Sequence, residues 1–134
     1  MPKTRVLLAD RHKAMLEGIK YLLEPNYEIV GIVNDTKSLL EAADRLRPDI
    51  AIVDLSMPKS NDFNVARQLK NRNPDLKVII LSVHDEALVV RETLAAGALG
   101  FVFKWTAAED LIPAIQNVLQ GYTYVSPAVR GKDG

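Results

Sequence analysis

Each of four short apolar runs leads directly into a polar residue, and together these residues could carry out phosphoryl chemistry: Asp10, Asp54, Ser82 and Lys104. A carboxylate such as Asp54 can act as a nucleophile and form an aspartyl phosphate. Lys104 could pair with one phosphoryl oxygen and Ser82 could donate a hydrogen bond to another. Asp10 could hold Mg²⁺, which binds a few carboxylates together with waters and phosphate oxygens. Taken singly, each residue is more often a turn, cap or solvated residue, but four together indicate a site.

The apolar runs alternate with segments of helical periodicity. The runs are Val6–Ala9, Ile29–Val33, Ile50–Val53, Val78–Leu81 and Phe101–Phe103. Their continuous apolar character predicts strands that are buried on both faces, as in a parallel sheet. Between them apolar residues recur at helical spacing, which indicates helices that pack on the sheet. This alternation predicts an α/β fold, with a doubly wound five-stranded parallel sheet and helices on both faces. The functional crevice of such a sheet lies at the carboxyl ends of its strands, where the four polar residues stand.

Several residues are expected to begin, end or bend the last two helices. Gly97 and Gly121 stand at good positions to end them, because glycine adopts a left-handed conformation at low cost. Thr106 and Glu109 have the spacing of a capping box at the start of the fifth helix. Pro113 falls inside that helix and is expected to kink it.

The composition narrows the functions that are open to the chain. Its 134 residues suit one domain, and 17 basic residues balance 17 acidic ones. There is therefore no bulk electrostatic reason to bind nucleic acid or an anionic membrane. The absence of cysteine excludes disulfides, thiolate chemistry and cysteine metal sites. The apolar runs are too short to span a bilayer, and no signal peptide is recognisable, so we expect a cytoplasmic protein with no membrane contact.

The order and spacing of these pieces resemble the receiver domain of two-component response regulators. The matching segments are Val6–Asp10, Asp54–Pro58, Ser82 and Gly97–Lys104. The resemblance implies a flavodoxin-like sheet with strand order 2-1-3-4-5. The stretch 121–127 is similar to the end of the receiver in transcriptional regulators of the LuxR/NarL/FixJ type. We therefore expect a receiver domain at residues 1–121 and, at residues 122–134, a linker to a missing DNA-binding effector domain, with the residues after Pro127 disordered.

The resemblance also implies a role for each site residue. Asp54 would be the phosphoacceptor, charged by a histidine kinase, and Ser82 and Lys104 would contact the phosphoryl group. Asp10, Asp54 and the backbone carbonyl of Ser56 would hold Mg²⁺. These roles describe a regulatory switch rather than an enzyme.

A further implied role belongs to Phe101, which would be an aromatic switch residue that turns inward when Ser82 moves toward the phosphoryl group. The surface of the fourth helix, fifth strand and fifth helix would then change its preference for partners. A homodimer through this surface is one hypothesis. DNA would be bound only through the missing effector domain.

One departure from the family concerns the metal site. Receivers usually carry two adjacent acids after the first strand, and here Arg11 stands in the second position. A guanidinium cannot ligate a cation and would repel one nearby, so Mg²⁺ binding is expected to be weakened. Arg11 could point to solvent, leaving a weak Mg²⁺ site at Asp10 and Asp54. Alternatively it could turn inward and pair with Asp54 or Asp10, which would make the chain a phosphorylation-independent pseudo-receiver that acts as an interaction module.

Other departures are smaller. Asn61-Asp62 replaces the usual Asp-Gly and is expected to alter its loop, since glycine alone adopts positive φ freely. Trp105 is expected to be exposed beside the partner surface. His12 is expected to cap or pack on the first helix, and His84 could control the access of water to phosphorylated Asp54 or could simply be a solvated loop residue.

Two other classes of protein fit less well. A phosphatase of the haloacid dehalogenase class would need a second acid two residues after Asp54, where Ser56 stands. A flavin or dinucleotide carrier would share the fold class, but no G-x-G-x-x-G follows the first strand.

Overall fold

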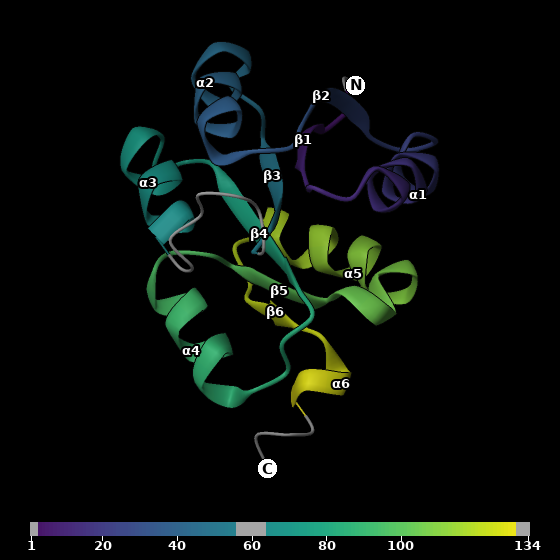
Figure 1. Ribbon diagram of the computed structural model, residues 1–134, viewed down its shortest axis with the longest axis vertical. Coiled ribbons are helices and arrows are strands. Elements are labelled where there is room, and N and C mark those ends of the chain that lie inside the picture. The colour runs from purple at the N-terminus through teal and green to yellow at the C-terminus, as the bar shows by residue number, and fades with distance from the viewer. Residues whose placement is uncertain (1–2, 56–63, 131–134) are drawn as a thin grey trace.

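The computed structural model describes residues 3–55 and 64–130, which form a parallel sheet flanked by helices (Figure 1). The strands are β1 (Arg5–Ala9), β2 (Glu28–Val33), β3 (Ile50–Asp54), β4 (Lys77–Ser82), β5 (Gly100–Phe103) and β6 (Tyr124–Val125). The helices are α1 (Lys13–Leu23), α2 (Thr36–Leu46), α3 (Asn64–Arg72), α4 (Ala87–Ala95), α5 (Ala107–Leu119), α6 (Pro127–Arg130) and a 3-10 turn, η1 (Lys104–Thr106). The strand order of the described sheet is β2-β1-β3-β4-β5-β6. The predicted fold class and the order of the first five strands are confirmed.

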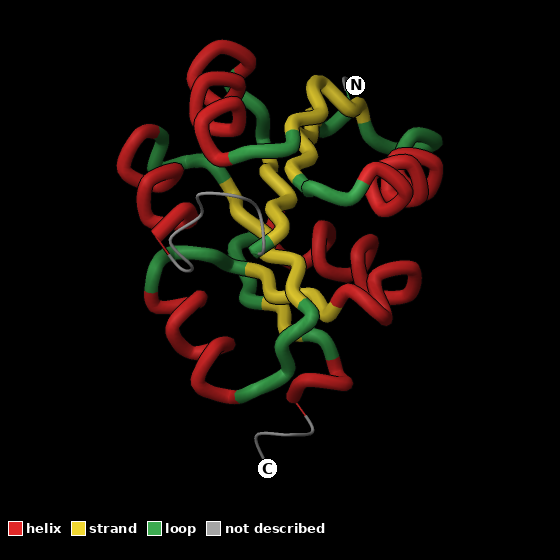
Figure 2. Tube along the Cα trace, in the orientation of Figure 1, coloured by secondary structure: helices red, strands yellow, loops and turns green. Residues whose placement is uncertain are grey.

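The helices form two layers, with α1 and α5 on one face of the sheet and α2, α3 and α4 on the other (Figures 1 and 2). The central strands alternate between these layers because successive side chains of a strand point to opposite faces. Leu7 and Ala9 of β1 join the core under α2 and α3, whereas Val6 and Leu8 join the core under α1 and α5. Both faces are apolar, which explains why the sequence shows continuous apolar runs rather than alternation.

The strand β2 differs from its prediction. Its residues were expected to be buried on both faces, but it lies at the edge of the sheet and is only partly covered. The side chain of Ile32 is 44% exposed. An apolar run therefore identified the strand correctly and overstated its burial.

The C-terminal segment also differs from the linker predicted at residues 122–134. Residues 124–125 form β6, which pairs in parallel with β5, Tyr124 facing Gly100 and Val125 facing Phe101. The short helix α6 (Pro127–Arg130) includes residues 128–130, which were expected to be disordered. The folded unit thus extends past Gly121, and the outer edge of β5 is covered by the chain itself.

The helix ends agree in part with the sequence. Gly97 and Gly121 adopt φ values of 115° and 88°, the left-handed conformation expected at a helix end. Thr106 is the N-cap of α5, but its side chain makes no capping hydrogen bond, so the predicted capping box is wrong. Its hydroxyl instead donates to the carboxylate of Asp110, at 2.6 Å.

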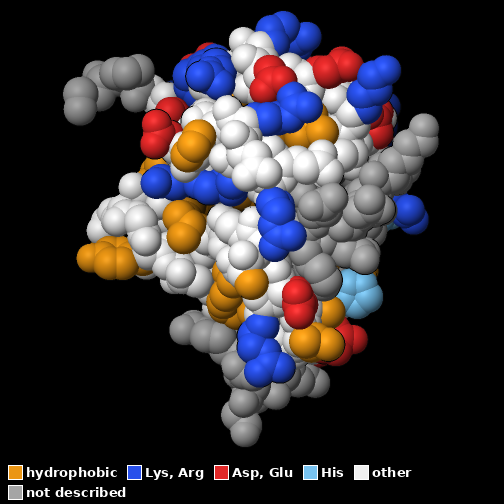
Figure 3. All heavy atoms as spheres, turned by 90° about the vertical axis from the view of Figure 1, so that its left-hand side faces the viewer, with side chains coloured by type: hydrophobic (Ala, Val, Ile, Leu, Met, Phe, Trp, Pro, Cys, Tyr) orange, Lys and Arg blue, Asp and Glu red, His pale blue; other side chains and the backbone are white. Residues whose placement is uncertain are grey.

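The surface over α2, α3 and α4 carries interspersed basic and acidic side chains, as the balanced composition suggests (Figure 3). Among residues 3–55 and 64–130, no helix has the length and apolar character needed to cross a bilayer.

Candidate phosphoacceptor site

The four polar residues selected from the sequence meet at the carboxyl edge of the sheet. Asp10 follows β1, Asp54 ends β3, Ser82 ends β4, and Lys104 begins η1 directly after β5. The pairing of Ala9 with Val53 places Asp10 beside Asp54. All four side chains are buried, Lys104 included. Burial of this many polar groups at one point is costly unless they are paired or functional.

Lys104 joins the two carboxylates. Its Nζ atom lies 3.0 Å from Oδ2 of Asp10 and 3.2 Å from Oδ1 of Asp54. It also donates a hydrogen bond to Oδ1 of Asp10, at 3.3 Å. One ammonium group therefore stands between two anionic groups that would otherwise repel each other.

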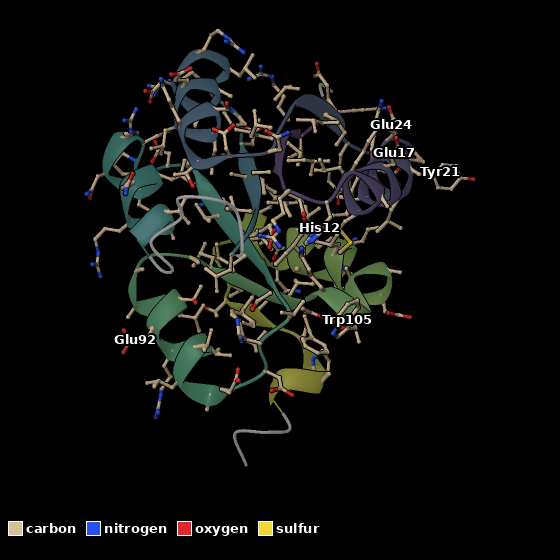
Figure 4. All side chains as sticks on the ribbon, viewed as in Figure 1. His12, Glu17, Tyr21, Glu24, Glu92 and Trp105 are labelled. Carbon is tan, nitrogen blue, oxygen red and sulfur yellow. The ribbon has the colours of Figure 1, made fainter. Side chains whose placement is uncertain are left out.

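His12 belongs to the same cluster, which the sequence did not predict. It is the N-cap residue of α1, yet its side chain makes no capping hydrogen bond. Its Nδ1 atom lies 3.2 Å from Oδ1 of Asp10 and 3.3 Å from Nζ of Lys104. Figure 4 shows His12 beside the strand ends. The available signal was its place two residues after Asp10, which also lets its backbone N–H donate to that carboxylate, at 2.8 Å.

The carboxyl group of Asp10 has a perturbed pKa. Burial raises its pKa above the ordinary value, and the hydrogen bonds from the His12 backbone and from Lys104 act in the opposite direction. Its Oδ2 atom has no aligned hydrogen-bond partner, although the Lys104 ammonium is close to it. A buried carboxylate oxygen in this condition suits a cation ligand.

The geometry of the cluster suits a small divalent cation. Ligand atoms of Asp10, His12 and Asp54 all lie within 4.8 Å of one another. Carboxylate oxygens are the ligands that Mg²⁺ prefers. Ser56, whose carbonyl was predicted as a further ligand, lies outside the described residues, as do Asn61 and Asp62.

Ser82 lies one residue beyond Leu81, which faces Asp54 across the sheet. Its Oγ atom accepts a hydrogen bond from the backbone N–H of His84, at 2.9 Å. This bond orients the hydroxyl and uses only its acceptor capacity, so its proton can be donated to another group. The His84 side chain lies 3.6 Å from the Glu86 carboxylate, at the surface.

Arg11 is exposed, and the cation that contacts both carboxylates is Lys104. The two alternatives for Arg11 stay predictions. Trp105 is exposed as expected, at 74%. It lines an apolar groove of about 570 Å³ between α1 and α5, with Met15, Ile19 and Leu111, rather than the α4 side of the sheet. Figure 4 shows Trp105 near α5 and Tyr21 projecting from α1.

Phe101, predicted as a switch residue, is fully buried against the core under α2, α3 and α4. Val125 of β6 packs on the same core opposite it. Its role as a switch residue stays a prediction.

A comparison with protein families decides the identity of the fold. The response regulator receiver domain matches residues 6–116. The chain belongs to the response regulator receiver family. The matched region holds Asp10, Asp54, Ser82 and Lys104, so the buried cluster lies within this receiver domain.

Relatives with known names support this assignment. The chain is 36% identical to the transcriptional regulatory protein DegU of Brevibacillus brevis over 129 residues, which are 95% of this chain and 55% of that protein. It thus spans little more than half of that relative. The RcsB response regulator of Salmonella typhimurium, in a structure concerned with DNA interaction, is 26% identical with a TM-score of 0.91, covering 98% of this chain and 67% of that one. The isolated RcsB receiver with the phosphomimetic BeF3⁻ is 26% identical, with a TM-score of 0.89 and coverage of 97% and 98%.

Proposed function

We propose that Asp54 accepts a phosphoryl group from a histidine kinase and that this receiver domain controls a DNA-binding output domain. The observation that carries the proposal is the contact of Lys104 with both Asp10 and Asp54 at the carboxyl edge of the sheet. The named relatives include transcriptional regulators longer than this chain, which supports an output domain that follows it. In this proposal the domain acts as a regulator because Asp54 receives a phosphoryl group, and it does not turn over a substrate.

In the proposed step, a carboxylate oxygen of Asp54 attacks the phosphorus of the donor. The new P–O bond makes an acyl phosphate as the bond from phosphorus to the donor nitrogen or oxygen breaks. The electron pair of that bond leaves with the donor group. Phosphoryl transfer needs positioning and charge stabilisation above all. Lys104 already lies 3.2 Å from Asp54 and could follow the developing negative charge, while Ser82 could donate its proton to a phosphoryl oxygen.

Asp10 and Asp54 would hold Mg²⁺, and the poorly partnered Oδ2 atom of Asp10 supports this assignment. When bound, the ion would neutralise charge between the carboxylates and the incoming phosphoryl oxygens. The role of the protein is to keep the two carboxylates adjacent and largely dehydrated, which β1 and β3 do through their pairing. The Ser56 carbonyl is proposed as a further ligand.

A second candidate is a phosphorylation-independent pseudo-receiver. Its motivation is Arg11, which stands where the family places a metal-binding acid. The exposed position of Arg11 and the Lys104 bridge favour the phosphorylated form over this alternative. A homodimer through α4, β5 and α5 is also a hypothesis, and any such contact must accommodate β6 on the outer edge of β5.

Intact-mass measurement after incubation with Mg²⁺ and acetyl phosphate tests the main proposal. We expect a gain of one phosphoryl group in the parent and none in Asp54→Asn. The asparagine keeps the shape of the side chain and lacks the nucleophilic carboxylate, so it is the matched control. Failure of the parent to gain mass at any Mg²⁺ concentration would establish the pseudo-receiver in its place.

A further inference from the structure

Ser126 is completely buried, although Thr123 and Pro127 on either side of its segment are exposed. Its Oγ atom accepts a hydrogen bond from the backbone N–H of Phe103, at 2.9 Å. Its own backbone N–H donates to the carbonyl of Phe101, also at 2.9 Å. One serine therefore satisfies two backbone groups on the outer edge of β5. Buried groups of this kind are costly to leave without partners, so the contact fixes the end of the strand.

The same segment is attached on the far side of Lys104. The hydroxyl of Tyr124 donates to Oδ1 of Asp110, at 3.1 Å. Oδ2 of Asp110 in turn accepts the hydroxyl of Thr106, at 2.6 Å. Thr106 ends the turn η1 that Lys104 begins. Residues 124–126 thus hold the chain at Phe103, one residue before Lys104, and at Thr106, two residues after it.

The position of the Lys104 ammonium depends on this backbone. Its four-carbon stem is flexible, so the chain must fix its Cα atom for Nζ to reach both carboxylates. The pairing of Phe103 with Ser82 across β4 and β5 ties the same point to a second residue of the site. A change at Lys104 should therefore alter the attachment of residues 124–126, and a change at residues 124–126 should alter the position of Lys104, since coupling between two sites is reciprocal.

We propose that Ser126 is a positioning residue for Lys104, and that the segment of residues 124–126 is coupled to the state of the phosphoacceptor site. The inference rests on the proposed function, in which Lys104 meets the phosphoryl group. A stronger anion at Asp54 holds Lys104 and the end of β5 more firmly, which tightens the attachment of residues 124–126. Loss of the Lys104 contact loosens it. Residues 124–126 are then the element through which the site acts on whatever follows the domain.

Hydrogen exchange read by mass spectrometry tests the coupling without any phosphoryl donor. We expect Lys104→Met to speed exchange in peptides covering residues 122–128 about tenfold or more, while peptides from α3, which does not contact Lys104 in the hydrogen bonds and ion pairs of the described residues, stay unchanged. Lys37→Met, an exposed lysine on α2, is the control and should leave both regions unchanged. Unaltered exchange at residues 122–128 in Lys104→Met would overturn the coupling.

The labelling rate with acetyl phosphate tests the positioning role. Ser126→Ala should slow labelling several-fold, and Ser126→Thr, which keeps the hydroxyl, should recover most of the rate. A merely structural serine would lower thermal stability in the alanine variant without changing the rate below the melting temperature, and that outcome would overturn the role. The proposed function and the coupling are tested separately. A parent protein that gains no phosphoryl group would contradict the proposed function, and the hydrogen-exchange experiment would still decide whether Lys104 and residues 122–128 are coupled.

Discussion

The Lys104 ammonium lies 3.0 Å from Oδ2 of Asp10, a contact between residues 94 positions apart in the chain. One ammonium group therefore contacts both Asp10 and Asp54. The pKa of Asp10 remains raised by burial in spite of this contact. The charged form of Asp10 is therefore unfavourable in the folded protein, and a metal ion or a change at Asp54 could relieve this cost.

Replacing Asp10 should stabilise the fold at neutral pH. A raised pKa means that folded Asp10 keeps its proton to a higher pH than the unfolded chain does. Between the two pKa values the native state binds more protons, so the free energy of unfolding falls as the pH rises through that interval. We expect Asp10→Asn to raise the free energy of unfolding at pH 7, measured by urea denaturation, because it removes a buried charge that also repels Asp54.

That gain should shrink as the pH falls below the raised pKa, because the parent carboxyl is then neutral too. Asp75→Asn, at an exposed position, should change stability by less than about 0.5 kcal/mol at either pH and is the control. A loss of stability in Asp10→Asn at pH 7 would mean that the contact with Lys104 outweighs the cost of burial.

Arg11 is expected to weaken the binding of Mg²⁺. Arg11→Asp removes a positive charge and adds a negative one beside Asp10, so Mg²⁺ should bind about tenfold or more tightly, equivalent to roughly 1.4 kcal/mol. Fluorescence of Trp105, the one tryptophan of the chain, can follow the titration because this residue adjoins Lys104. Arg11→Gln, which only removes charge, should give an intermediate affinity. Equal affinities in all three proteins would show that the guanidinium is too far from the ion to matter.

Gly100 is required by the close approach of β5 to β4. A Cβ atom at this position would lie 2.9 Å from Cγ1 of Ile79 and 3.3 Å from its Cβ, both near the rigid part of a buried side chain. We expect Gly100→Ala to destabilise the fold by about 1–3 kcal/mol in thermal or urea unfolding. Gly18→Ala is the matched control, because nothing lies within 4 Å of a Cβ added there, in α1. It should be neutral or stabilise the helix by up to about 1 kcal/mol, and equal effects at the two positions would contradict the packing argument.

The sequence predicted the sheet because strands buried on both faces leave a continuous apolar signature, as in Ile50–Val53. It predicted the site residues for a related reason, since parallel strands bring their carboxyl ends to one edge and Asp54 and Lys104 had to meet there. The approach of His12 was missed because it depends on a side-chain rotamer, which periodicity does not encode. The strand β6 was missed because two residues are too few for a pattern and its partner β5 lies more than twenty positions away.

Removal of β6 should show how much the residues after Gly121 contribute to the stability of the domain. A chain ending at residue 121 loses the backbone hydrogen bonds that Tyr124 donates to Leu99 and Ser126 donates to Phe101, together with the packing of Val125 on the core. We expect its free energy of unfolding to fall by about 2–4 kcal/mol in urea. The newly bare edge of β5 should also promote self-association, visible by light scattering as a mass that rises with concentration. A chain ending at residue 130 keeps all of β6 and should behave as the parent does. A chain of 121 residues with the stability and mass of a parent monomer would show that β6 lies on the sheet without holding it.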